Sequence, residues 1–188
     1  MGRFSLFCAV LVTVCQPLVQ AEGPATKQPD VGYYPTTQDV VDHVLKLARV
    51  TDKDLVCDLG CGDGRVVLSA ARQYGCRAIG YEIDPKLVAE GRTKIRDAKL
   101  DKLAQIQAQD IFTVDLSQTN VVFLFLLPEL NARLIPQLQK LPPGSRIVTH
   151  EFPIPGVKPD SELTWHSKQD DSEHLLFVYR TPLTRDAP

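Results

Sequence analysis

The segment Val56–Arg65 constrains the fold of this chain more than any other. An apolar run, Leu55–Leu59, predicts a buried strand, and it leads into a loop with glycines at alternate positions, Gly60, Gly62 and Gly64. The apolar residues that follow predict a helix. A strand, a glycine loop and a helix in this order are typical of the nucleotide-binding turn of an α/β sheet. Glycine lets the backbone approach a ligand closely, and the start of a helix offers free N–H groups to it.

Two acidic residues lie at informative distances from the glycine loop. Asp58 precedes Gly60 by two positions, and Glu82 follows Gly64 by eighteen, at the end of a second expected strand, Arg77–Tyr81. An acidic residue at about that distance can hydrogen-bond both hydroxyls of a ribose. The G-x-G-x-G spacing differs from the G-x-G-x-x-G of dinucleotide oxidoreductases, which argues against an NAD-dependent enzyme.

Strand and helix patterns alternate through the rest of the chain. Continuous apolar runs predict buried strands, and apolar residues at helical spacing predict helices between them. The expected strands are Leu55–Leu59, Arg77–Tyr81, Ala104–Ala108, Val121–Leu127 and Arg146–Phe152, followed by a hairpin of Leu163–His166 and Leu175–Tyr179. This order predicts a Rossmann-like α/β fold, with a mostly parallel, doubly wound sheet and a C-terminal antiparallel hairpin.

The loop before the first helix is a candidate part of the site. Thr36 and Asp39 have the spacing of a capping box, which predicts the start of a helix that continues with Val40 and Val44 on its apolar face. We expect this helix to pack on the sheet and its leading loop, Tyr34–Thr37, to cover a bound ligand.

Asp110 lies just beyond the third expected strand, Ala104–Ala108. Ligands of parallel sheets bind beyond the carboxyl ends of the strands. A carboxylate there can accept a hydrogen bond from an adenine amino group, whereas the structural alternative is a turn aspartate. Because the first two strands already supply the rest of a nucleoside site, we favour the adenine role.

These motifs resemble those of class I S-adenosylmethionine (SAM)-dependent methyltransferases. Among these enzymes, the chain is most similar to small single-domain protein-lysine methyltransferases, including mitochondrial ones, and more remotely to the non-SET histone methyltransferase that acts on nucleosomes. The resemblance is carried by residues 34–41, 58–65, 109–112, 126–131 and 141–152. It implies SAM as the cofactor and a protein-lysine amine as the methyl acceptor.

The resemblance also implies roles for individual residues. Asp58, Gly60 and Gly62 would hold the methionine end of SAM, Glu82 would bind the ribose hydroxyls, and Asp110 would bind adenine together with the backbone of Ile111. The residues expected at the cofactor are Tyr34, Thr36, Asp58, Gly60, Cys61, Gly62, Gly64, Glu82, Asp110, Ile111 and Leu126. We expect no metal site.

Leu126 and Leu127 lie at the end of the fourth expected strand, and the resemblance implies that the substrate enters at this position. Enzymes that methylate the amines of nucleic-acid bases tend to have Asp or Asn there, followed by Pro-Pro and an aromatic residue. This chain has Leu-Leu-Pro-Glu, which counts against a base amine as the acceptor. The terminal hairpin and the lack of a large inserted lid predict an open site, which favours a protein substrate. A small-molecule methyltransferase and a noncatalytic SAM- or nucleoside-binding module are the alternatives.

A lysine must lose its proton before it can accept a methyl group, and a carboxylate near a desolvated pocket can assist. Glu129 and Glu151 are candidates for this catalytic role, and His150 is a third. Each carboxylate has a structural alternative of equal weight: Glu129 can stabilise a helix start, and Glu151 can be a surface strand end. The catalytic residue is otherwise unassigned.

Composition limits the partners and the redox chemistry. The formal net charge is −2, so we expect no nucleic-acid partner. Outside the first 21 residues the chain keeps Cys57, Cys61 and Cys76, an odd number at no metal spacing, which is not a disulfide framework.

The N-terminal segment differs from the rest of the chain. Residues 1–21 have the layout of a secretory signal peptide, with Arg3, an apolar run from Phe4 to Cys15, and a small residue, Ala21, at the expected cleavage position. The alternative is an uncleaved membrane anchor. We expect the protein to be exported (periplasmic or extracellular) or membrane-anchored through this segment, with a linker at 22–32, a methyltransferase domain at 33–182 and a tail at 183–188.

Overall fold

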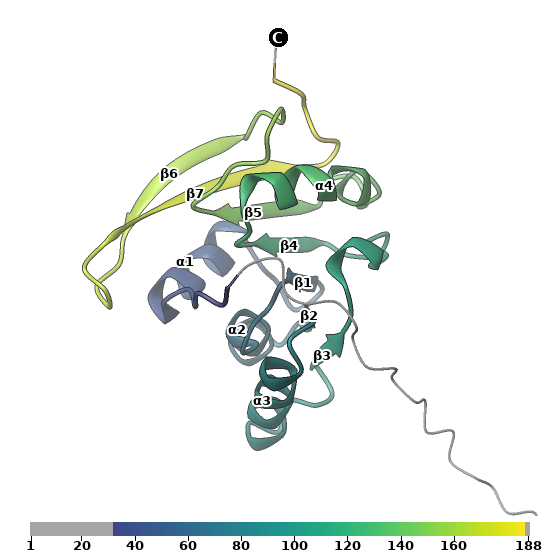
Figure 1. Ribbon diagram of the computed structural model, residues 1–188, viewed down its shortest axis with the longest axis vertical. Helices are drawn as coiled ribbons and strands as arrows, with labels where there is room; N and C mark the ends of the chain where they lie inside the picture. The colour runs from purple at the N-terminus through teal and green to yellow at the C-terminus, as the bar shows by residue number, and fades with distance from the viewer. Residues whose placement is uncertain (1–31, 187–188) are drawn as a thin grey trace, which may run out of the picture.

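The computed structural model describes residues 32–186, which are built around one seven-stranded sheet (Figure 1). The expectations for residues 1–21, for most of the linker and for the last two residues lie outside the described residues. The helices are α1 (Gln38–Leu47), α2 (Arg65–Tyr74), α3 (Pro85–Asp97) and α4 (Pro128–Leu138), with a short 3₁₀ turn η1 (Ile111–Thr113). The strands are β1 (Leu55–Leu59), β2 (Arg77–Glu82), β3 (Ala104–Ala108), β4 (Val121–Leu124), β5 (Arg146–His150), β6 (Ser161–His166) and β7 (Glu173–Arg180).

The strand order is β3-β2-β1-β4-β5-β7-β6. Strands β1 to β5 are parallel, and β7 runs antiparallel to both β5 and β6. This confirms the expected parallel sheet with a C-terminal hairpin. The sheet grows in one direction from β1 to β3 and in the other from β4 onward, so β1 and β4 flank the switch point where such sheets bind ligands.

Two hydrophobic cores cover the two faces of the sheet. Successive strand side chains point to opposite faces, so Val56 packs with α1, α2 and α3 whereas its neighbour Cys57 packs with α4. The same alternation separates Phe123 from Leu124 in β4. Burial on both faces explains why these strands read as continuous apolar runs in the sequence. Cys57, Cys61 and Cys76 are free thiols, and all of them are buried.

Strands β4 and β5 end earlier than the apolar runs predicted. The sequence favoured strands to Leu127 and Phe152, but the chain leaves the sheet after Leu124 and His150. The buried side-chain amide of Asn131 accounts for part of this. It donates to the carbonyls of Leu126 (3.3 Å) and Phe152 (3.2 Å), which holds both loops at the start of α4 instead of in the sheet.

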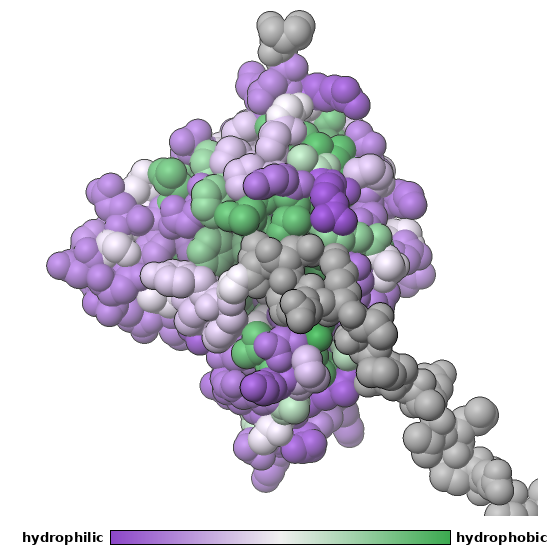
Figure 2. Space-filling view, in the orientation of Figure 1, coloured by the Kyte–Doolittle hydropathy of each residue, from purple (hydrophilic) through white to green (hydrophobic). Residues whose placement is uncertain are grey.

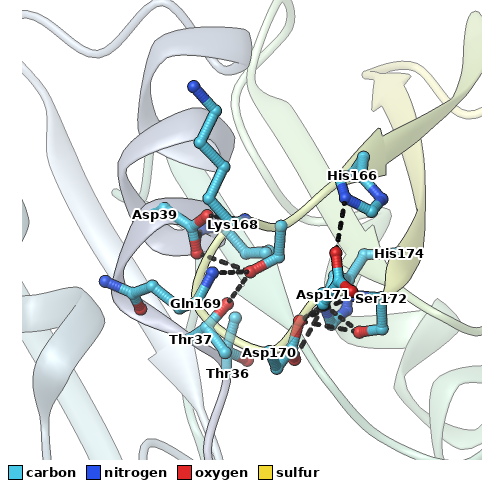
Figure 3. A network of polar contacts seen from close by, with 12 residues as sticks. Thr36, Thr37, Asp39, His166, Lys168, Gln169, Asp170, Asp171, Ser172 and His174 are labelled. Carbon is cyan, nitrogen blue, oxygen red and sulfur yellow. Dashed lines mark hydrogen bonds and ion pairs between the residues drawn. The ribbon is translucent and has the colours of Figure 1, made fainter.

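The capping-box prediction for α1 is wrong. The N-cap is Thr37, which makes no side-chain capping bond. Asp39 instead accepts hydrogen bonds from the backbone N–H of Lys168 (2.8 Å) and from the Ser167 hydroxyl (2.9 Å) in the β6–β7 turn (Figure 3). Thr36 is committed to another tertiary contact, with the His150 ring. Tertiary hydrogen bonds have replaced the local ones that the spacing suggested.

The chain closes back on itself after β7. Leu183 packs against the core that contains α4. The carbonyl of Thr184 accepts a hydrogen bond from the N–H of Lys158, and the N–H of Asp186 donates to the carbonyl of Gly156. Trp165 of β6 stacks on His43 of α1 with ring centroids 3.7 Å apart, so it packs the hairpin against this helix. No helix within residues 32–186 is both long and apolar enough to cross a membrane.

Candidate active site

A cavity of about 540 Å³ opens at the carboxyl edge of the parallel strands. All the residues expected at the cofactor line it except Gly64. They come from the loop before α1, the ends of β1, β2 and β4, and the segment after β3, which are brought together because parallel strands present their carboxyl ends at one edge. The volume suits a ligand of nucleoside size with an amino-acid extension.

The glycine loop has the backbone that the sequence predicted. At Gly62 φ is +53°, and a Cβ would lie 2.4 Å from the ring of Tyr33, so a larger residue would collide with the segment that covers the loop. Gly64 has φ +79° and caps α2, where a Cβ would lie 2.5 Å from Ile106. Gly62 therefore keeps the cavity floor open, whereas Gly64 lets α2 pack against the sheet.

Glu82 ties the end of β2 to the glycine loop. Its carboxylate accepts from the backbone N–H of Gly62 (2.9 Å), Ile83 (2.8 Å) and Asp84 (2.9 Å). A carboxylate can accept about four hydrogen bonds, so capacity remains for a ligand hydroxyl. The side chain is thus fixed in orientation before any ligand binds.

Asp58 is a buried acidic residue at the floor of the cavity. Burial raises the pKa of its carboxyl well above the ordinary value, and the negative charges of Glu82 and Asp63 raise it further. A ligand with positive charge next to Asp58 would remove this penalty. The site is therefore built to attract a cationic group.

Asp63 and Arg65 hold the covering segment in place, a role that the sequence analysis missed. Arg65 donates to the Asp63 carboxylate from Nε (3.0 Å) and Nη2 (3.0 Å), and its Nη1 donates to the Thr36 carbonyl at 2.6 Å. Lys94 of α3 adds an ion pair to Asp63 at 2.7 Å. Burial alone would raise the pKa of Asp63, but hydrogen bonds from Arg65 and Lys94 outweigh it and bring the pKa to about 2. We call Asp63, Arg65 and Lys94 the loop clamp.

Asp110 keeps its side chain at the cavity while it also caps η1. Its carboxylate accepts from the N–H of Phe112 at 3.1 Å. Ile111 is held from the other side, because its carbonyl accepts from the Gln137 amide of α4 at 2.9 Å. The expected adenine-binding residues thus sit on a turn fixed at both ends.

The mouth of the cavity is apolar and aromatic. It is lined by Tyr34, Phe125, Leu127 and Phe152. The rings of Tyr34 and Phe125 meet edge to face with centroids 6.4 Å apart, and the Tyr34 side chain is 79% exposed. Figure 2 shows hydrophobic side chains gathered near the middle of the drawn face, bordered by hydrophilic ones. Sequence reasoning placed Leu126 and Leu127 here but did not single out Phe125 or Phe152.

The three candidates for a catalytic base do not line the cavity. Glu129 is exposed in the first turn of α4. His150 is buried behind Phe125, with ring centroids 4.1 Å apart, and burial together with the neighbouring His174 lowers the pKa of His150 to about 3. Glu151 contacts His174 at 3.0 Å rather than the cavity.

Comparison with known families identifies the class of enzyme. Residues 58–161 match the model of the ANTKMT methyltransferase domain, and these residues include the glycine loop, Glu82 and Asp110. The chain belongs to this family. It is therefore a class I methyltransferase, and SAM is its cofactor.

Individual relatives agree with this assignment. The chain is 37% identical to a protein-lysine N-methyltransferase of Saccharolobus islandicus, over 80% of this chain and 94% of the relative. It is 38% identical to the adenine nucleotide translocase lysine N-methyltransferase of Mus musculus, over 69% of this chain and 56% of that protein. A crystal structure of an RNA methyltransferase from Salinibacter ruber with S-adenosyl-L-homocysteine superimposes with a TM-score of 0.73 at 36% identity, covering 82% of this chain and 97% of the other.

The residues of this cavity fit the cofactor of the family. SAM carries a sulfonium and an ammonium group, and a cation beside the buried Asp58 would stabilise the ionised form of its carboxyl, whose pKa is raised by burial. Glu82 retains acceptor capacity for a ribose hydroxyl. The acidic floor counts against a phosphate-bearing dinucleotide, which the sequence had already disfavoured by its glycine spacing.

Proposed function

We propose that the protein transfers the methyl group of SAM to the side-chain amine of a protein lysine. The names of the Saccharolobus and mouse relatives, both lysine methyltransferases, support this acceptor. The chain spans just over half of the mouse protein, so the particular substrate of that enzyme is not carried over.

The aromatic mouth is the observation that carries the proposal. A lysine has a long apolar stem that can lie along the rings of Tyr34 and Phe125 at the mouth, and this places its amine toward the buried part of the cavity. Aromatic faces also attract an ammonium group before it loses its proton. The exposed position of Tyr34 leaves this mouth accessible to a residue on a folded protein or a peptide.

We propose that the cofactor is held by the residues that the sequence singled out. Asp58 would face the positively charged methionine end of SAM, Glu82 the ribose, and Asp110 with Ile111 the adenine. The loop clamp would keep Tyr34 and Thr36 closed over the glycine loop.

Bound SAM supplies an electrophilic methyl group on a sulfonium. The protein aligns the lysine nitrogen with that carbon and excludes water from the buried part of the cavity. Because an amine surrounded by apolar side chains has a lowered pKa, the walls formed by Phe125, Leu127 and Phe152 would favour loss of the lysine proton to solvent at the mouth, before the amine reaches the water-excluding part of the cavity. The residues of the mouth would hold the neutral amine in line with the methyl group that bound SAM would supply, and the methylated ammonium would release one proton to water as it leaves the cavity.

The acceptor is tested with SAM labelled in its methyl group. Label incorporated into protein, and recovered as methyl-lysine after hydrolysis, supports the proposal. The Salinibacter structure raises RNA as a second candidate acceptor. The net charge of −2 disfavours RNA. Label recovered in RNA but not in protein would replace the proposal with the RNA alternative.

The mouth is tested with Tyr34→Ala, with Tyr34→Phe as the matched control. We expect the alanine variant to raise KM for the protein substrate several-fold and the phenylalanine variant to behave as the parent, because the ring face and not the hydroxyl forms the wall. Affinity for SAM is measured in parallel, so that a loss of cofactor cover is recognised as such.

We also propose that residues 1–21 direct the chain to export or hold it at a membrane. The positive first residues and the apolar run support this. The intact mass of the protein recovered from cells tests it: loss of about 21 residues indicates a cleaved signal, a full-length product in the membrane fraction indicates an anchor, and a full-length product in the soluble cytosol would refute both.

A further inference from the structure

A cluster of two histidines and a glutamate lies behind the aromatic mouth. His150 ends β5, Glu151 follows it, and His174 lies on the neighbouring strand β7. Three atoms converge: His150 Nε2 and His174 Nδ1 are 2.9 Å apart, and Glu151 Oε1 lies 3.2 Å from the first and 3.0 Å from the second. The two histidines are almost fully buried, and the carboxylate is 29% exposed.

The outer nitrogens of both rings are already engaged. His174 Nε2 lies 3.2 Å from the Asp170 carboxylate, which at neutral pH can only accept, so this nitrogen carries the proton (Figure 3). His150 Nδ1 lies 3.2 Å from the Thr36 hydroxyl. If Nδ1 donates to this hydroxyl, both inner nitrogens present lone pairs, and the third converging atom is a carboxylate oxygen. In this tautomer three acceptor atoms face one another, and a cation between them would satisfy all three.

We propose that His150, Glu151 and His174 bind a divalent transition-metal ion, for which zinc is the best fit. Two imidazoles and one carboxylate are a recognised zinc ligand set. Tetrahedral ligands at about 2.0–2.1 Å from zinc stand about 3.3 Å apart, so the observed triangle needs to expand by only a few tenths of an ångström.

The surroundings have further features of a metal site. The Asp170–His174 contact reproduces the carboxylate–histidine–metal arrangement that orients a ligating imidazole. Glu151 adopts φ +63°, an unfavourable conformation for a residue other than glycine, and this turn brings its carboxylate back toward the rings. Its partial exposure leaves a path for the ion and a fourth position for water.

The ion would connect the end of β5 to β7 directly behind Phe125. Since the cluster does not line the cavity, the metal would stabilise the mouth and the β6–β7 hairpin rather than take part in methyl transfer. No metal motif is visible in the sequence because the ligands come from two strands, with His150 and His174 separated by 24 residues.

Zinc binding to the chelator-stripped full chain tests this proposal. Calorimetry should show one equivalent bound with submicromolar affinity, and the midpoint of thermal unfolding should rise on binding. Glu151→Gln and His174→Gln should each weaken binding at least tenfold. His166→Ala is the matched control, because His166 is an exposed histidine of the same hairpin that pairs with Asp171 instead, and it should leave the affinity unchanged.

A second measurement excludes the cysteines as the ligands. The cobalt(II) form should show d–d absorption without a thiolate-to-cobalt charge-transfer band, since no sulfur is present in the cluster. S-adenosylhomocysteine binding confirms that each variant is folded. The proposal is overturned if the folded parent binds no zinc, if both glutamine variants bind it as the parent does, or if the cobalt spectrum carries the thiolate band.

Discussion

Asp63→Asn should destabilise the protein through the loop clamp. The carboxylate is 5% exposed and receives ion pairs from Arg65 and Lys94. A fall in pKa from 3.8 to about 2 corresponds to roughly 2 kcal/mol of stability at neutral pH. The Arg65 and Lys94 side chains are 29% and 39% exposed, so screening by water reduces this to about 1–2 kcal/mol.

The stability lost in Asp63→Asn should depend on pH. Because the folded-state pKa of Asp63 lies below its ordinary value, its contribution is fully present above about pH 5 and disappears as the pH falls toward 2. The difference in unfolding free energy between parent and variant should therefore be constant from about pH 7 to 5 and reduced by roughly half at pH 3.

Urea unfolding followed by circular dichroism, repeated across this pH range, measures the difference. Asp101→Asn, an exposed carboxylate in the turn after α3, is the matched control and should change the unfolding free energy little. The affinity for SAM should also fall in Asp63→Asn, because Arg65 then loses its anchor beneath Thr36. Equal stability of parent and Asp63→Asn at pH 7, or a difference that persists undiminished at pH 3, would refute the reasoning.

Three further predictions concern Gly62, Asn131 and Asp58. Gly62→Ala should weaken SAM binding at least tenfold, because the added methyl group meets the Tyr33 ring. Gly156→Ala is the control, since Gly156 also has a positive φ (+71°) but lies in open space, and it should leave the affinity unchanged. Equal Kd values in the two variants would contradict this. Asn131→Ala should lower the unfolding free energy by about 2–3 kcal/mol, because the substitution leaves backbone carbonyls of the loops after β4 and β5 without a donor. A decrease below about 0.5 kcal/mol, measured by urea unfolding, would be inconsistent with this role of Asn131. SAM binding should release protons, because the raised pKa of Asp58 falls when a cation binds beside it, and the affinity should therefore rise with pH. Calorimetry in buffers of different ionisation enthalpy detects the release, which Asp58→Asn should abolish.

Much of the fold could be predicted because the informative patterns are local. The expected strands Leu55–Leu59 and Ala104–Ala108 match β1 and β3 residue for residue, and the helix that begins at Arg65 follows the glycine loop as expected. Strand ends were less accurate, since β4 and β5 stop where Asn131 captures the carbonyls of the following loops. Hydrophobicity continues past those points because Leu126 and Phe152 face the cavity and α4 rather than the sheet.

The site shows the same division between local and tertiary signals. Residues next to strand ends, such as Glu82 and Asp110, could be placed because parallel strands present their carboxyl ends together. The role of Asp63 could not be predicted, since its partner Lys94 lies on α3, 31 positions away in the sequence. The His150, Glu151 and His174 cluster depends on the pairing of β5 with β7, which sequence spacing does not reveal.

Calorimetric titration of the full chain with SAM, beside Glu82→Ala, tests the central claim most directly. The account predicts one binding site with micromolar affinity in the parent, weakened at least tenfold (about 1.4 kcal/mol) in Glu82→Ala. The exposed Glu162→Ala on β6 should bind as the parent does. A folded parent that does not bind SAM, or a Glu82→Ala variant that binds it as tightly as the parent, would contradict the account.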